Sequence, residues 1–71
     1  MEKPPHVLRM EVELNELRIR HEHLCHFILS STSTFRDLAH EDQGLLHLQK
    51  AIMEIYAQTL EKRLARARPP S

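Results

Sequence analysis

Three polar side chains recur at heptad spacing along one edge of a helix expected in the second half of the chain. They are Gln49, Tyr56 and Arg63, and at 1.5 Å per residue their tips form a line about 21 Å long. A tyrosine ring can stack on a base while arginines hold phosphate. We therefore take Tyr56, Arg63 and Arg66, with Gln49 and Ser30 beside them, as candidate ligand-binding residues.

The same row has a structural interpretation. Polar groups at this spacing also hydrogen-bond across helices or at the seam of an oligomer, where they set the register. Arg63 would then pair with an acidic residue such as Glu13 or Glu16. Both interpretations stay open at the level of sequence.

The segment from His21 to His26 gathers several potential metal ligands. His21 and Cys25 share a helix face at a spacing of four residues, as do Glu22 and His26. No face of one helix gathers three ligands, so a closed zinc site would need a second chain or His47. The simpler interpretation is a polar seam position beside a small apolar thiol, and we predict neither a metal nor another cofactor.

No catalytic motif accompanies these residues. The sequence holds no phosphate-binding glycine loop, no dinucleotide fingerprint and no Gly-flanked serine. Cys25 lies in an apolar setting that disfavours the reactive thiolate. We predict a non-enzymatic protein.

Charge and hydropathy narrow the partners. Lys plus Arg is 10 and Asp plus Glu is 10, so the formal net charge is +0 and no overall field attracts nucleic acid or anionic membranes. No apolar run is long enough to cross a bilayer, and the single cysteine points to no disulfide framework. We predict a cytoplasmic protein that binds neither nucleic acid nor membrane.

The elements that position these residues are helices. One Gly, no Trp and 4% aromatics, with abundant helix formers, favour the all-α class. Apolar periodicity predicts one antiparallel two-helix hairpin over 6–67, with helices at about 7–29 and 41–66. Residues 30–40 form its turn and include a short helical piece around Phe35 and Leu38. We expect residues 1–5 and 68–71, which carry prolines, to be disordered.

The apolar arc of the second helix is wider than one partner helix can cover. A 71-residue chain without disulfides needs another source of burial, so we expect a homo-oligomer, a dimer or larger, built as a helical bundle. The predicted core consists of Met10, Leu14, Leu17, Leu24, Ile28, Leu45, Leu48, Ile52, Met53, Ile55 and Leu60.

One pattern resembles a known family. It reads Leu45-Leu46-x-x-Gln49-x-x-x-Met53-x-x-Tyr56-x-x-x-Leu60-x-x-Arg63, preceded by Phe27-Ile28-x-Ser30, Phe35, Leu38 and Gln43. From about Val12 to Arg63 the chain resembles very small helical-hairpin proteins encoded by tailed bacteriophages, which are functionally uncharacterised. The resemblance implies a phage accessory protein that acts in the host cytoplasm.

The architecture is also similar to that of phage sponge proteins, which sequester cyclic nucleotide signals in pockets between subunits. Our leading hypothesis is a non-catalytic protein that binds a host component, in its sharper form a counter-defence sponge for a nucleotide signal. One alternative is a structural or assembly module without a small ligand. A third hypothesis is an inhibitor of a host enzyme that presents an acidic face formed by Glu11, Glu13, Glu16 and Glu22.

Overall fold

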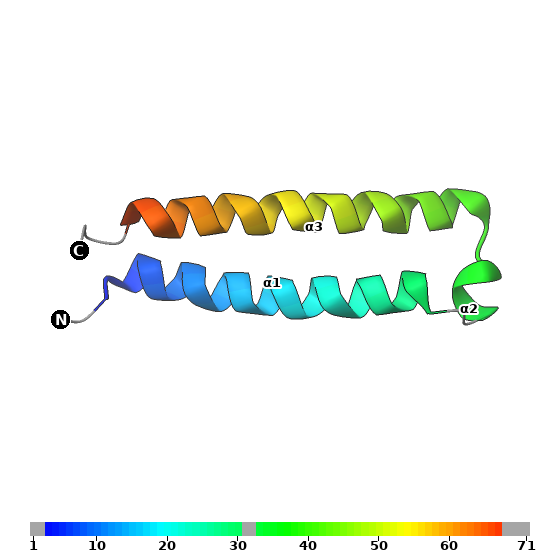
Figure 1. Cartoon of the computed structure of the whole chain (residues 1–71), viewed down its shortest axis with the longest axis horizontal. Coiled ribbons are helices and arrows are strands. Elements are labelled where there is room, and N and C mark those ends of the chain that lie inside the picture. The colour runs from blue at the N-terminus through cyan, green and yellow to red at the C-terminus, as the bar shows by residue number, and fades with distance from the viewer. Residues whose placement is uncertain (1–2, 31–32, 68–71) are drawn as a thin grey trace.

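The protein is a long antiparallel hairpin of helices. The computed structural model describes residues 3–30 and 33–67, arranged as α1 (Pro5–Leu29), α2 (Ser33–Arg36) and α3 (His40–Ala67). Helices α1 and α3 lie side by side along their whole length, and α2 lies at the turn (Figure 1). The molecule measures 51 × 18 × 16 Å. The predicted all-α class with two long packed helices is confirmed. The predicted disordered tail, 68–71, lies outside the described residues.

Local chemistry explains where the helices begin and end. Helix α1 starts at Pro5, slightly before the start that the periodicity predicts, because a proline without an N–H fits the first turn. It ends where Ser30 turns extended, with φ −65° and ψ 135°, and its N–H donates to the His26 carbonyl at 2.7 Å. Helix α3 opens with Glu41 and Asp42, whose charges complement the positive end of the helix dipole.

The turn is held by ring packing and one side-chain amide. The Phe35 ring meets Phe27 and His47 edge-on, each at 5.8 Å between centroids. The Gln43 amide donates to the Leu38 carbonyl at 2.9 Å. The short helical piece is therefore present, but it spans Ser33–Arg36 rather than centring on Phe35 and Leu38.

The buried core is concentrated at the open end of the hairpin, away from the turn. In the described part of the chain the buried residues are apolar and come from the first part of α1 and the last part of α3. They are Val7, Met10, Leu14, Leu17, Leu60 and Leu64. Toward the turn, Leu24, Ile28 and Leu46 are only half-buried.

The polar row of α3 lies outside the face that packs against α1. Gln49, Tyr56 and Arg63 are exposed, and the face against α1 continues through Ala57 and Leu64 instead. A row through Tyr56 and a row through Ala57 would both contain Met53 and Leu60. The two rows differ in which of these residues, Tyr56 or Ala57, lies between Met53 and Leu60 against α1. Packing the small Ala57 and the apolar Leu64 inward lets the helices approach without desolvating an amide, a phenol and a guanidinium.

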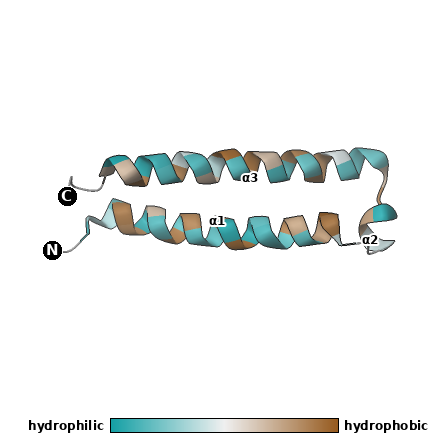
Figure 2. Ribbon diagram, viewed as in Figure 1, coloured by the Kyte–Doolittle hydropathy of each residue, from teal (hydrophilic) through white to brown (hydrophobic). Residues whose placement is uncertain are grey.

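The predicted oligomer core divides into two sets. Met10, Leu14, Leu17 and Leu60 are buried within the single hairpin, and Leu24, Ile28 and Met53 are half-buried there. The remaining members point outward on α3. They are Leu45, Leu48, Ile52 and Ile55, each more than half exposed. Figure 2 shows hydrophobic residues recurring along the whole length of both long helices.

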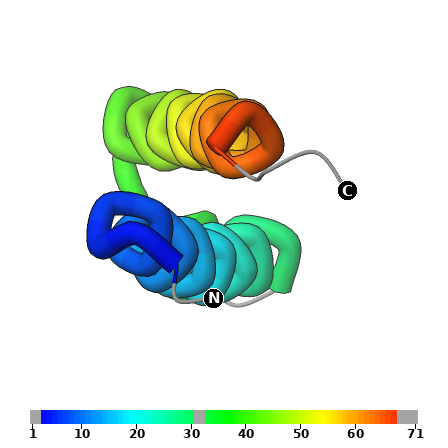
Figure 3. Tube along the Cα trace, turned by 90° about the vertical axis from the view of Figure 1, so that its left-hand side faces the viewer, coloured from blue at the N-terminus to red at the C-terminus, as the bar shows by residue number. Residues whose placement is uncertain are grey.

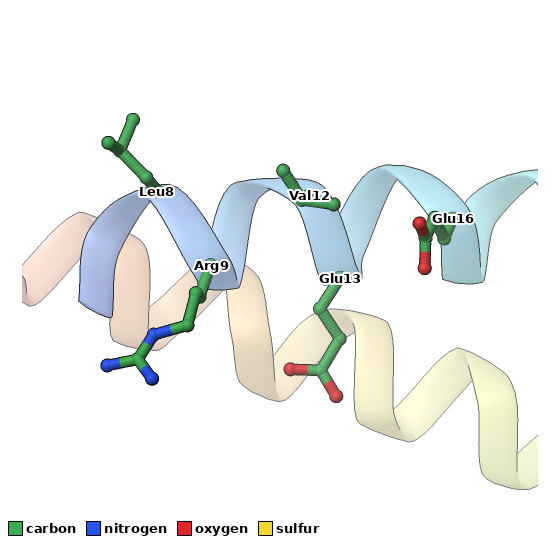
Figure 4. A pocket seen from close by; sticks show the side chains of 5 residues that line it. All are labelled: Leu8, Arg9, Val12, Glu13 and Glu16. Carbon is green, nitrogen blue, oxygen red and sulfur yellow. The ribbon is translucent and has the colours of Figure 1, made fainter. Parts of the chain in front are cut away.

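Helix α1 also carries apolar residues on its outer face. Leu8, Val12 and Ile19 are 49%, 58% and 46% exposed. Leu8 and Val12 point away from α3 (Figure 4).

Among the described residues, no helix combines the length and apolar character needed to cross a membrane.

Candidate functional site

Tyr56 bridges the two helices on one flank of the hairpin. Its hydroxyl donates a hydrogen bond to the Glu13 carboxylate of α1. This bond raises the pKa of Tyr56 above its usual range, because ionisation would place a phenolate against a carboxylate; the nearby positive charge of Arg63 acts in the opposite direction. Tyr56 thus makes a hydrogen bond between the two helices, as the structural interpretation of the polar row expects. In the described part of the chain Glu13 forms no ion pair with Arg63.

We expect the Glu13→Gln variant to lower the pKa of Tyr56. The amide removes the carboxylate that disfavours the phenolate, while the opposing charge of Arg63 remains. The chain has one tyrosine and no tryptophan, so an ultraviolet titration of the phenol reports this group alone. Because the folded-state pKa is raised, the stabilising effect is present below the ordinary pKa and is lost as the pH rises through the raised one. An unchanged midpoint in Glu13→Gln would contradict the bond.

A basic hollow lies at the open end of the hairpin, where the first turns of α1 lie beside the last turns of α3. It has a volume of about 290 Å³ and is lined by His6 and Met10 of α1 and by Arg63, Arg66 and Ala67 of α3. Figure 3 looks onto this end, with the first turn of α1 and the last turn of α3 nearest the viewer. Within the described part of the chain, neither Arg63 nor Arg66 forms an ion pair or a side-chain hydrogen bond.

The hollow brings together part of the predicted ligand set. Arg63 and Arg66 share it, and Tyr56 lies two turns away along α3, about 10 Å by helical rise. Ser30 lies at the turn, where its hydroxyl donates to the Phe27 carbonyl at 3.3 Å, so one hairpin does not unite it with the arginines. Gln49 is exposed and lies a further two turns from Tyr56 toward the turn.

His6 was missed from the sequence. An isolated histidine beside two prolines carries no motif. The available signal was topological, because two helices of similar length joined by a short turn must place the start of the first against the end of the second. His6 therefore had to lie near Arg63 and Arg66.

Three of the four carboxylates of the predicted acidic face, those of Glu11, Glu13 and Glu16, have partners within the chain. The Lys3 ammonium donates to Glu11 at 3.0 Å, and Arg20 pairs with Glu16 at 3.4 Å. Glu13 accepts from Tyr56. A second hollow of about 360 Å³, lined by Leu8, Arg9, Val12, Glu13 and Glu16, is formed by α1 alone (Figure 4). The lining of this hollow combines one arginine with two glutamates, so the surface is not uniformly acidic.

Two residues of the histidine and cysteine segment, His21 and Cys25, belong to a group of polar contacts that connects α1 with α3. His21 Nε2 lies 3.0 Å from a Glu54 oxygen, and the Lys50 ammonium donates to the same oxygen at 2.9 Å. The Cys25 sulfur lies 3.6 Å from His21 Nε2. The pKa of Glu54 is lowered, first by the Lys50 hydrogen bond and then by His21, so this contribution to stability is lost as the pH falls. In the ranges 3–30 and 33–67, no three His, Cys, Asp or Glu side chains form a group suited to a metal ion.

Comparison with known proteins assigns the chain to a family. The model of the family described as Sequestin matches residues 4–66, which include both long helices and the basic hollow apart from Ala67. Comparison with curated proteins and with solved structures finds no match. The family name suggests that its members bind or sequester a partner. The chain therefore belongs to the Sequestin family.

Proposed function

We propose that this chain is a non-catalytic binding protein that captures a phosphate-bearing nucleotide signal in the basic hollow at the open end of the hairpin. Arg63 and Arg66 line one hollow and have no acidic partner in the described part of the chain. This observation carries the proposal, because two neighbouring arginines without a counter-charge offer several N–H donors and positive charge to a phosphate group. His6 adds a further donor from the other helix.

The proposed biological role is sequestration. The chain self-associates, acts in a host cytoplasm as a phage accessory protein, and removes the signal by stoichiometric capture rather than by turnover. The resemblance to phage-encoded hairpins and the family name support this role. Met10 and the aliphatic stems of the arginines supply an apolar wall for a base or sugar, while the guanidinium groups face the phosphate.

Thermal unfolding with added nucleotides tests the proposal. The probes are cyclic di-AMP, cyclic GMP and inorganic phosphate. A ligand that binds only the folded chain adds about 2.7 kcal/mol at 100 times its Kd, which raises the Tm of so small a protein by roughly 10 °C or more. We expect a cyclic nucleotide to produce this rise and Arg63→Ala to abolish it.

Lys62→Ala is the matched control. It removes a neighbouring positive charge of the same helix that does not line the hollow. It should bind nearly as well as the wild type. If Lys62→Ala and Arg63→Ala weaken nucleotide binding equally, the nucleotide is held by non-specific electrostatic attraction to the basic helix end, and the hollow is not the binding site. If none of the nucleotides raises the Tm, or inorganic phosphate protects equally well, the nucleotide proposal is wrong.

A further inference from the structure

An apolar row runs along the outer face of α3 and is not covered by α1. We call Leu45, Leu48, Ile52 and Ile55 the outer stripe; they are 61%, 55%, 56% and 63% exposed. Their spacing of three, four and three residues is that of the a and d positions of a heptad. Such a stripe is covered fully only by another helix that runs nearly along it.

The two ends of the outer stripe carry opposite net charge. Glu41 and Asp42 precede it. After it, within α3, one acidic residue is outnumbered by three basic ones, which are Glu61 against Lys62, Arg63 and Arg66. Two copies of α3 aligned in parallel would place like charges together. In the antiparallel alignment the acidic end of each copy lies along the basic end of the other, so the stripe and its flanks are complementary to themselves.

The apolar residues select one register of that alignment. When Leu45 of one copy packs on Ile55 of the other, and Leu48 on Ile52, all four residues of the stripe find apolar partners. Sliding one copy by a heptad in one direction places Leu45 against Lys62 and leaves part of the stripe uncovered.

Gly44 leaves room for a close neighbour at this edge. It lies inside α3, where glycine costs helix stability relative to alanine. A Cβ at this position would meet nothing within 4 Å, so packing within the single chain does not require glycine. Gly44 and the exposed Ala51 lie seven residues apart along the same edge of the stripe, where small residues allow a second backbone to approach.

We propose that the outer stripe is the seam at which a second copy of this chain docks antiparallel, about a two-fold axis near residue 50. The inference deepens the self-association in the proposed function and rests on it. The two-fold axis places the two basic hollows at opposite ends of the dimer. One dimer then offers two separate sites, one for each chain.

Native mass and sedimentation equilibrium of Ile52→Lys test the seam. The control is Ile19→Lys, the same substitution at an exposed position on the outer face of α1. Neither side chain is buried in the hairpin, so both variants should remain helical by circular dichroism. We expect Ile52→Lys to raise the dimer Kd by about 100-fold or more and Ile19→Lys to leave the dimer intact. If Ile19→Lys dissociates the protein and Ile52→Lys does not, the seam lies on α1 and the inference is wrong.

Chemical cross-linking tests the orientation. In a Cys25→Ser background, a short bismaleimide should join two copies of Ala51→Cys, because this position lies near the proposed axis. Gln58→Cys should not be joined, since antiparallel docking separates its two copies by about 24 Å along the helix axes. Efficient joining of Gln58→Cys would indicate parallel docking and would overturn the proposal.

Gly44→Ala separates packing within the chain from packing between chains. Alanine should favour the helix of one hairpin, yet its methyl group should crowd the neighbouring helix and raise the dimer Kd by about tenfold. A tighter dimer in Gly44→Ala would contradict close approach of the two helices at this edge.

If the wild type is a monomer, the proposed seam and the proposed self-association are both wrong. Nucleotide protection in the thermal assay would still support capture at the hollow.

Discussion

Leu60→Ala is expected to lower the free energy of unfolding by about 3 kcal/mol. Leu60 is 0% exposed and belongs to the cluster that joins the two long helices. Truncating a buried leucine removes its transfer free energy and leaves a cavity, at a typical cost of about 2–5 kcal/mol. A small domain has roughly 5 kcal/mol in total, so the variant should lose about half of its stability. Urea unfolding followed by circular dichroism measures the change.

Leu29→Ala is the control for this substitution. Leu29 is 77% exposed at the end of α1 and lies outside the outer stripe. The same change in side chain should therefore shift the urea midpoint only slightly. Equal losses in the two variants would show that Leu60 is not the centre of the core.

Leu14→Asp is expected to prevent folding at neutral pH. Leu14 is 6% exposed in the middle of the buried cluster, and among the described residues that cluster contains no cation. A carboxylate there loses its hydration without gaining a partner, which costs several kcal/mol and exceeds the stability available. Circular dichroism should show a loss of helix that acidification partly restores, because protonation removes the buried charge.

Val12→Asp provides the matched comparison. Val12 lies two residues before Leu14 on the same helix, but it is 58% exposed and points away from α3 (Figure 4). Its aspartate stays hydrated, so we expect near wild-type helix content and stability. If both aspartates unfold the protein alike, the outer face of α1 is buried in the assembled state.

Much of the fold follows from residue periodicity alone. Val7, Met10, Leu14 and Leu17 recur every three or four residues, and this spacing has one physical solution, a helix with one buried face. The face of α3 was harder to predict, because Leu46, Met53 and Leu60 fit two heptad paths. Which path is buried depends on whether Tyr56 or Ala57 turns inward, and that is decided by how closely the helices approach.

The candidate site was predictable only in part. Arg63 and Arg66 are close in sequence, so any helix brings them together. Ser30 was grouped with them because its hydroxyl suits phosphate, but residue type gives no distance, and the antiparallel hairpin places the turn far from the chain ends. The Tyr56 to Glu13 bond depends on the rotation of each helix about its axis, which periodicity defines only to within a residue.

The position of the buried core affects how the chain must fold. Local contacts at the turn close short loops, but the residues that bury most surface, Met10 and Leu14 with Leu60 and Leu64, are separated by about 50 positions in sequence. The chain must therefore lose most of its loop-closure entropy before its main stabilising contacts form. Zipping from the turn therefore gains little free energy until its final steps, although most contacts of the hairpin are local ones within single helices, as is typical of fast helical folders.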